Sequence, residues 1–155
     1  MKTIYTAIIS RLKEKVTGIK WIDLDTGQLD TVERPPVMLP CALISIAITQ
    51  AKSITDTLQD CTATVTVTLA FDTLERTSAN APETTRNASL AAYDTIADVY
   101  AALQGWGTVN FDSLSRTRQQ KENNRHNLFK YRIDFSVQFE DATAEVENTT
   151  AEEED

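Results

Sequence analysis

The chain has 155 residues, of which 41% are hydrophobic and 25% charged, and its formal net charge is −8. This length is typical of one domain that buries a full core without metal ions or disulfides. No apolar run approaches the ~20 residues that span a bilayer, and the N-terminus lacks the apolar segment of a signal peptide, so we expect neither feature.

The negative charge is concentrated at the C-terminal end. Between Glu140 and Asp155 there are eight acids and no Lys or Arg, which leaves 15 acids against 15 bases in residues 1–139. The last 15 residues contain one Val and no apolar period, so they cannot bury enough surface to offset the entropy of ordering. We therefore predict a near-neutral folded domain over residues 1–140 and an acidic disordered tail over residues 141–155.

The first predicted element is an amphipathic helix over Thr3–Val16. Thr3 is a suitable N-cap, and Gly18 can end the helix. The apolar residues at helical spacing are Ile4, Ile8, Ile9, Leu12 and Val16. Basic residues also make a membrane-surface helix possible, but the apolar stripe has the width expected of a helix lying on a sheet.

The next segments alternate between strands and loops. Ile19–Leu24 predicts a short strand, and Asp25–Gln28 a turn in which Gly supplies the unusual backbone angle. Leu29–Met38 contains two consecutive prolines, which are typical of a loop or an edge. Cys41–Ile48 is apolar on both faces and predicts a central strand. Thr49–Gln59 is polar, and either a hairpin loop or a short helical turn fits it.

The clearest element is the strand Cys61–Phe71. Every second residue is apolar, and the residues between them are threonines except for Ala70. Because successive side chains of a strand point to opposite faces, we expect one face in the core and the other in water. Both cysteines of the chain, Cys41 and Cys61, lie in predicted strands. We expect buried free thiols rather than a disulfide.

A second helix follows a polar loop over Asp72–Thr85. Asn87–Gln104 carries apolar residues at helical spacing, and Gly105 can end the helix. Those apolar residues are Ala92, Tyr93, Ile96, Val99, Tyr100 and Leu103. We expect Trp106 to pack in the core at the sheet edge rather than to hold a ligand.

The C-terminal part predicts two more strands, Thr108–Phe111 and Phe129–Phe139, the second with strict alternation. Between them, Ser113–Asn127 has no core pattern and predicts a long, solvated, mobile arm. The expected order is α-β-β-β-α-β-β. The expected fold is α+β: a two-layer sandwich in which two helices cover one face of an antiparallel or mixed sheet of four to five strands, with a long hairpin arm.

No group of residues predicts a catalytic or metal site. The one histidine, His126, lies in the polar arm, where it is poorly placed to act as a base. Cys41 and Cys61 lack metal-ligand spacing, and no Gly-rich phosphate loop is present. We expect no catalytic residue, no metal and no cofactor, and we expect that the chain is not an enzyme.

The arm is unusually basic. Its cations are Arg116, Arg118, Lys121, Arg125, Lys130 and Arg132. Glu122 is the one acid among them. A solvated hairpin explains this pattern, as does contact with an acidic surface of a neighbouring subunit or with nucleic-acid phosphates. No aromatic residue interrupts the charges before Phe129, so a base-stacking platform is not expected.

The order of these elements resembles the tail terminator proteins, also called tail-completion or neck proteins, of long-tailed bacteriophages and prophages. The resemblance covers nearly the whole chain and rests on patterns rather than on invariant residues. The matching positions are Ile4–Val16, Pro40–Ile48, Cys61–Phe71, Ala88–Gly105 with Leu103-Gln104-Gly105-Trp106, and Phe129–Phe139. The acidic extension after Glu140 is not part of the pattern.

The resemblance implies a homo-oligomeric ring, commonly a hexamer, at the head–tail junction of a virion. The ring caps the tail tube, joins it to the head connector, and lets DNA pass through its lumen without sequence-specific contact. The protein would be made in the bacterial host cytoplasm and would not contact a membrane. The subunit contact would lie at the Thr face of Cys61–Phe71, at a strand edge, or at the arm. The acidic tail would repel DNA or pair with a neighbour's arm.

Two alternatives belong to other classes. A nucleic-acid-binding α+β module would use the basic residues 116–132 and bind in a salt-dependent manner. A domain that binds a small ligand would require an apolar pocket.

Overall fold

The protein is an α+β domain, and the computed structural model describes residues 1–145 of it. Its elements are α1 (Lys2–Lys15), β1 (Trp21–Leu24), the short 3-10 helix η1 (Gln28–Asp30), β2 (Cys41–Ser53), β3 (Gln59–Phe71), α2 (Glu83–Leu103), β4 (Ser115–Glu122) and β5 (Phe129–Asp141). The predicted order is confirmed. Of the predicted tail, Asp141 belongs to β5, and everything after Glu145 lies outside the described residues.

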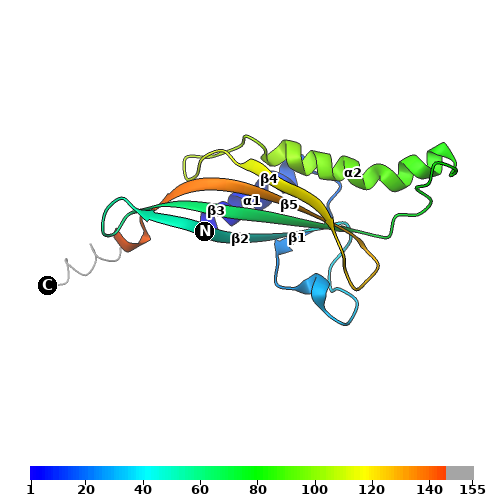
Figure 1. The fold of residues 1–155 in the computed structure, drawn as a ribbon, viewed down its shortest axis with the longest axis horizontal. Helices are drawn as coiled ribbons and strands as arrows, with labels where there is room; N and C mark the ends of the chain where they lie inside the picture. The colour runs from blue at the N-terminus through cyan, green and yellow to red at the C-terminus, as the bar shows by residue number, and fades with distance from the viewer. Residues whose placement is uncertain (146–155) are drawn as a thin grey trace.

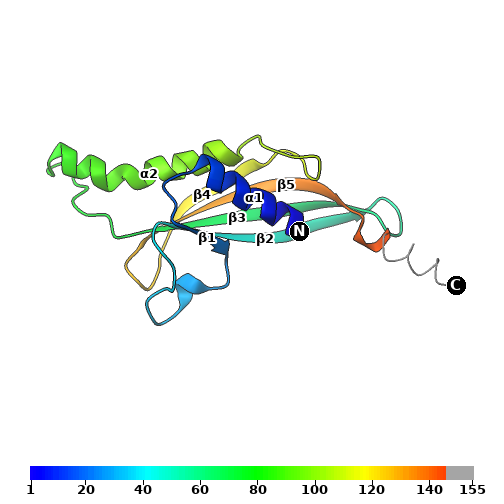
Figure 2. The ribbon, with the colours of Figure 1, turned by 180° about the vertical axis from the view of Figure 1, so that it is seen from behind.

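The five strands form one mixed sheet in the order β1-β2-β3-β5-β4. β1 is parallel to β2, and the other neighbouring strands are antiparallel. The two long helices lie on the same face of the sheet, behind it in Figure 1 and in front of it in Figure 2. The predicted two-layer sandwich is therefore confirmed. In the described part of the chain, no helix is both long enough and apolar enough to cross a membrane.

The main core lies between the helices and the sheet. Along β3, all six apolar residues of the alternating pattern are buried. The helices contribute their predicted stripes: α1 buries Ile4, Ile8 and Leu12, and α2 buries residues from Ala92 onward. This packing favours the sheet-bound alternative for the first helix over the membrane-surface one.

The opposite face of the sheet carries a second, smaller core at one end. It consists of Leu29, Cys41, Leu43 and Ala70, with Val37, Leu39 and Leu128 packed around them. The prediction that the whole Thr face of β3 is wet was wrong here, because residues 25–40 fold over it. Thr68 is 5% exposed. The expected free thiols are confirmed, since both cysteines are buried and unpaired. Burial raises the pKa of Cys41 to about 11.

The ends of several elements differ from the predictions. Met1, not Thr3, is the N-cap of α1, and α2 begins at Glu83. Gly105 follows α2 with a φ of +72°, the left-handed conformation common after a helix. Between β2 and β3 the hairpin alternative is confirmed: the two strands extend to Ser53 and Gln59, and the Ile54 N–H donates to the Leu58 carbonyl at 2.8 Å.

The predicted strand Thr108–Phe111 is wrong, because these two residues form only an isolated bridge within a compact turn. Gly107 sits so tightly in this turn that a Cβ would lie 2.9 Å from the backbone of Asp112 and Ser113. Trp106 packs edge-on against Phe111, with ring centroids 5.4 Å apart, and joins the main core as expected. The fourth strand instead lies within the segment predicted as a mobile arm.

Candidate functional site

The predicted arm is an ordered hairpin of β4 and β5. β4 pairs with β5 from Ser115 to Glu122, so the prediction of a mobile segment over Ser113–Asn127 was wrong. The Asn124 side chain organises the connecting turn. Its Oδ1 accepts hydrogen bonds from the N–H groups of His126 at 3.0 Å and Leu128 at 2.9 Å, and its Nδ2 donates to the Leu128 carbonyl at 2.6 Å. These three hydrogen bonds close the turn between β4 and β5.

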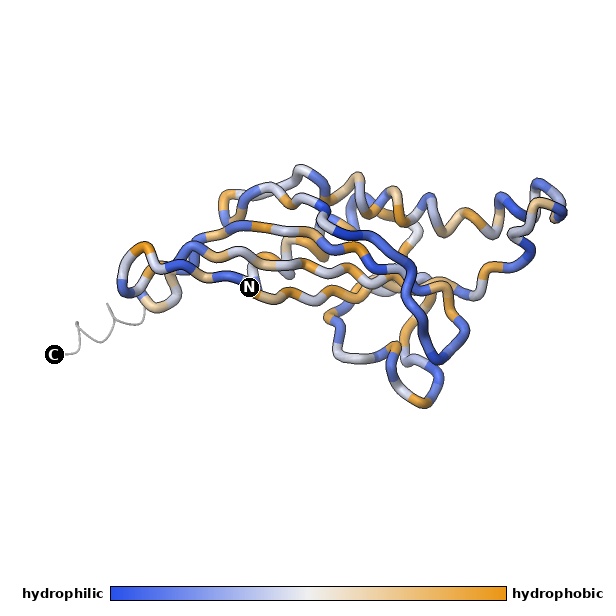
Figure 3. The backbone as a smooth tube through the Cα atoms, viewed as in Figure 1, coloured by the Kyte–Doolittle hydropathy of each residue, from blue (hydrophilic) through white to orange (hydrophobic). Residues whose placement is uncertain are grey.

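The strand β4 was missed because it buries neither face. Its sequence SRTRQQKE contains no apolar residue, and Figure 3 shows β4 as a continuous hydrophilic stretch. Six of its eight residues are exposed and two are half-buried. Periodicity detects a strand only when one face differs from the other. An edge strand that is polar on both faces gives no such signal.

The pairing with β5 separates the predicted basic residues onto different faces. Residues opposite each other in a ladder share a face. Arg116 is opposite Phe135 and Lys121 is opposite Tyr131, both on the helix side. The Arg116 guanidinium carbon lies 3.9 Å from the centre of the Tyr100 ring of α2. Arg118 is opposite Asp134, on the other face.

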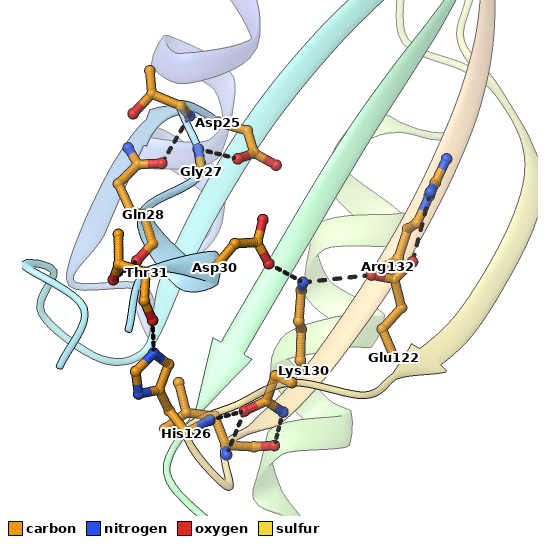
Figure 4. Close-up of polar contacts among 12 residues, drawn as sticks. Asp25, Gly27, Gln28, Asp30, Thr31, Glu122, His126, Lys130 and Arg132 are labelled. Atoms are coloured by element: carbon orange, nitrogen blue, oxygen red, sulfur yellow. Dashed lines mark hydrogen bonds and ion pairs between the residues drawn. The ribbon is translucent and has the colours of Figure 1, made fainter. Parts of the chain in front are cut away.

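Two of the six cations are already neutralised. The Lys130 ammonium lies 3.7 Å from a Glu122 oxygen and 3.8 Å from an Asp30 oxygen (Figure 4). Arg132 Nε donates to Asp134 Oδ1 at 2.9 Å, and its other end is 3.6 Å from Glu122. These contacts raise the pKa of Arg132, mainly through the Asp134 hydrogen bond. Lys130 and Arg132 thus stabilise the sheet rather than form a free binding surface.

Asp134 is the buried centre of this charged row. Its side chain also accepts a hydrogen bond from Thr66 Oγ1 at 2.7 Å, so β3 and β5 are joined on the face opposite the helices. Asp134 is 6% exposed, and one of its oxygens has two donors. A buried carboxylate with such partners is a structural group, because its charge is already matched.

The other four cations, Arg116, Arg118, Lys121 and Arg125, have no ion pair with any residue from 1 to 145. All four side chains are exposed. Arg116 donates to Gln119 Oε1 at 2.8 Å, and Arg118 donates to Gln120 Oε1 at 2.8 and 3.1 Å. Neutral amides orient these guanidinium groups but leave their charge uncompensated. We call these four residues the free cations of the hairpin.

His126 connects the hairpin to residues 25–40, the loop that covers the second core. Its Nε2 lies 2.7 Å from the Thr31 carbonyl oxygen, next to the Lys130–Asp30 ion pair (Figure 4). It also lines a groove of about 610 Å³ together with Lys20, Arg34 and Asp72. Among residues 1–145, no group of three or more His, Cys, Asp or Glu side chains is placed to hold a metal ion.

The sheet has two open edges, one at β4 and one along most of β2. A strand edge was predicted as one possible subunit contact, but the sequence did not identify these strands. β1 pairs only with residues 41–44 of β2, so the outer edge of β2 from Ser45 to Ser53 is unpaired within the described chain. The Asp25 N–H donates to the Ile44 carbonyl at 2.9 Å. Ile46 and Ile48 follow Ile44 at intervals of two residues. Their backbone N–H and C=O groups therefore also point away from β3, into open space. The two strands predicted here, Ile19–Leu24 and Cys41–Ile48, were similar in length, so nothing in the predicted lengths indicated this open edge.

Comparisons with known proteins add little to this geometry. No protein-family model matches the chain, and no curated protein matches it. Among solved structures, the chain is similar to one from the virion of a native gene transfer agent particle. The two share 17% sequence identity with a TM-score of 0.47, over 89% of this chain and 95% of that one. A likeness at this level assigns neither a site nor a function.

Proposed function

We propose that this chain is a structural protein of a phage-type virion, a ring-forming tail terminator that caps the tail tube and joins it to the head connector. One observation carries the proposal: a single domain presents two open sheet edges on opposite sides. A ring needs two different, complementary surfaces on each subunit, because its contacts are heterologous. The element order supports the same function through its resemblance to the tail terminator proteins.

The two edges have compatible directions and lengths. β2 is antiparallel to β3, β3 to β5, and β5 to β4, so β2 and β4 run in opposite directions within the sheet. Copies related by rotation about an axis along the strands would therefore bring β4 of one copy antiparallel to β2 of the next. The open part of β2 has nine residues, Ser45–Ser53, and β4 has eight, of which Arg116 already donates its N–H to Gln104 Oε1 at 2.8 Å. The sheet could thus continue from subunit to subunit.

The chemistry of the edges also favours this pairing. A β4–β4 contact would place Arg116, Arg118 and Lys121 against their own copies, and like charges across a ladder are destabilising. The β2 edge carries one charge, Lys52, and Ile48 is 40% exposed. Exposed edges normally have charges or prolines that prevent association. The β2 edge has little of this protection, which suits a surface that a neighbour covers.

The mass of the purified protein in solution tests the proposal. We expect a concentration-dependent oligomer of several subunits that is lost in Ala51→Pro. Ala51 is exposed, and because the register shift between Ile48 and Gln50 adds one residue to β2, its N–H points to the open edge. Proline at this position therefore blocks a neighbour while the internal ladder remains. Ala51→Ser keeps the N–H and is the matched control. Circular dichroism verifies that both variants fold.

The outcomes are distinct. A monomer at every concentration that also fails to bind tail-tube and connector proteins contradicts the proposal. A dimer with no larger species points to a symmetric β2–β2 contact and rules out the ring. Loss of the oligomer in both variants means that the β2 edge acts through packing rather than through strand pairing.

Nucleic-acid binding by residues 116–132 is the second candidate, and the four free cations favour it. Lys130 and Arg132 no longer contribute to it, because their charges are paired. Salt-sensitive DNA binding that Arg118→Gln weakens would support this function.

A further inference from the structure

Two acids at the other edge of the sheet match the free cations of the hairpin. Asp23 lies in β1 and Asp25 directly follows this strand, and neither has an ion pair with any residue from 1 to 145. Asp23 Oδ1 accepts the Leu24 N–H at 2.8 Å, and Asp25 Oδ1 accepts the Gly27 N–H at 3.0 Å (Figure 4). Neutral donors orient both carboxylates but leave their charge uncompensated, as neutral amides do for the guanidinium groups on β4.

We propose that Lys121 and Arg125 of one copy bind Asp25 and Asp23 of the next copy in the ring. The inference rests on the proposed function, which it deepens by naming the side chains that fix how two copies align. Backbone pairing alone allows several registers along an open edge. A charge contact at one end of that edge selects one of them.

The direction of the strands brings these groups together. The Asp25 N–H donates to the Ile44 carbonyl, so Asp25 stands where the open part of β2 begins. A neighbouring β4 that runs antiparallel to β2 has its C-terminal end at this point. With the eight residues of β4 laid along Ser45–Ser53, Lys121 falls one or two residues from Asp25. That is a step of about 3–7 Å along the strand, which the flexible four-carbon stem of Lys spans.

Arg125 meets the second acid in the same arrangement. It lies three residues past the end of β4, in the turn to β5, so it continues beyond the open edge of the neighbour to β1. There Asp23 is opposite Leu43, two residues before the open edge begins. Lys121, Arg125 and Asp25 are exposed and Asp23 is half-buried, so all four groups are accessible to another copy.

The neighbouring charges are compatible with this contact. Glu122 is the last residue of β4, and two cations of β5 already pair with it. Lys20 directly precedes β1 and lies at its other end, while Lys52 is opposite Asp60 of β3, whose charge offsets it. Contacts between two cationic edges or two acidic edges bring like charges together. The cationic edge of one copy therefore favours the acidic edge of the next, which is a heterologous contact.

Charge reversal in the full chain tests the inference. Lys121→Glu sets an acid against Asp25 of the next copy, and Asp25→Lys sets a cation against Lys121. Because like charges at an interface oppose association, the dissociation constant of each variant should be at least about tenfold larger than that of the natural chain. Sedimentation at low salt measures the mass of each variant across protein concentrations.

Mixing the two variants should restore the oligomer. In an alternating assembly, each reversed charge faces a reversed charge of opposite sign, and each natural charge faces its natural partner. With one variant isotopically heavy, native mass spectrometry should show equal numbers of both chains. The double variant Lys121→Glu with Asp25→Lys restores the match in every copy and should assemble alone.

Arg118→Glu is the matched control, because it makes the same change of charge on the same strand but at the other end of the antiparallel contact. It should not restore assembly when mixed with Asp25→Lys. Asp25→Asn is a milder variant, since it keeps an oxygen for the Gly27 N–H and removes only the charge. It should weaken association by up to about fivefold. Circular dichroism verifies that every variant folds.

The results separate this inference from the proposed function. Natural oligomers that neither reversal weakens overturn the inference and leave the ring standing. So do reversals whose effect mixing does not undo, or that Arg118→Glu undoes equally well. A natural chain that is monomeric at every concentration contradicts both. Loss of the oligomer in Ala51→Pro without any effect of the reversals means that strand pairing holds the copies together and that these charges do not.

Discussion

The two faces of the sheet are stabilised by different interactions. The helix face is apolar and buried in the central strands, with Val65, Val67 and Phe135 fully covered. The opposite face is apolar only at one end, under residues 25–40, and then carries the row Asp134, Arg132, Glu122 and Lys130. The helix face therefore supplies most of the free energy of folding, while the opposite face positions the β4–β5 hairpin.

The largest expected effect comes from the helix face. Phe135→Ala should lower the free energy of unfolding by about 3–5 kcal/mol, because it removes a fully buried ring and leaves a cavity. Thr64→Ala, on the opposite face of the neighbouring strand, should cost no more than about 1 kcal/mol. Urea denaturation at pH 7 measures both. Equal losses would mean that the two faces contribute alike.

The second core predicts an intermediate effect that depends on pH. Burial raises the pKa of Cys41 to about 11 from its ordinary value of 9.0. Well below pH 9, the Cys41 thiol is neutral in both the folded and the unfolded state, so its contribution to the free energy of unfolding is fully present. As pH rises from 9 to 11, the unfolded chain ionises first, so the free energy of unfolding should fall by about 2 kcal/mol through Cys41.

Cys41→Ala is the matched control for this pH dependence. It should lose stability less steeply between pH 9 and 11 than the natural chain does, although it starts lower. The pKa of Cys61 is also raised by burial, but that group is present in both proteins and cancels. Parallel curves would show that the Cys41 thiol is accessible to water and that the second core is open.

The charged row predicts the smallest effect. Asp134→Asn should cost about 1 kcal/mol, because it weakens the hydrogen bonds from Thr66 and Arg132 at a site that is 6% exposed. Asp30→Asn, whose side chain is 75% exposed, should change stability by less than about 0.5 kcal/mol. Denaturation at low and high salt separates them. A larger loss at Asp30 would place the centre of the row at the loop instead of at β5.

Prediction from sequence succeeded where burial differs between alternating positions. The strands around Val67 and Ile133 and the helical stripes at Ile8 and Ile96 were found because each has one apolar face. The alternation in Phe129–Phe139 places Asp134 on the non-helix face, where it lies, but it did not indicate that Arg132 and Thr66 would enclose the side chain. Its burial depends on neighbours that are two and 68 residues away.

The basic arm shows the opposite case. Its six cations are close in sequence, yet strand register sends Arg116 to the helix side, Arg118 to the other face, and Lys130 to acids on β4 and η1. The sequence shows how many charges a segment carries. Which of these cations pair with acids depends on which strand lies alongside the segment. The predicted cluster of six therefore became two paired cations and four free ones.

By itself, the amino-acid sequence determined the α+β class, the element order, the buried faces and the free thiols, because these follow from hydrophobic period and local backbone preference. Only the tertiary structure decided that β4 is an edge strand, that residues 25–40 cover one end of the second face, and that β2 keeps an open edge. The physical reason is that edge position, register and loop coverage are set by contacts between distant segments, and these leave no periodic trace in either segment alone.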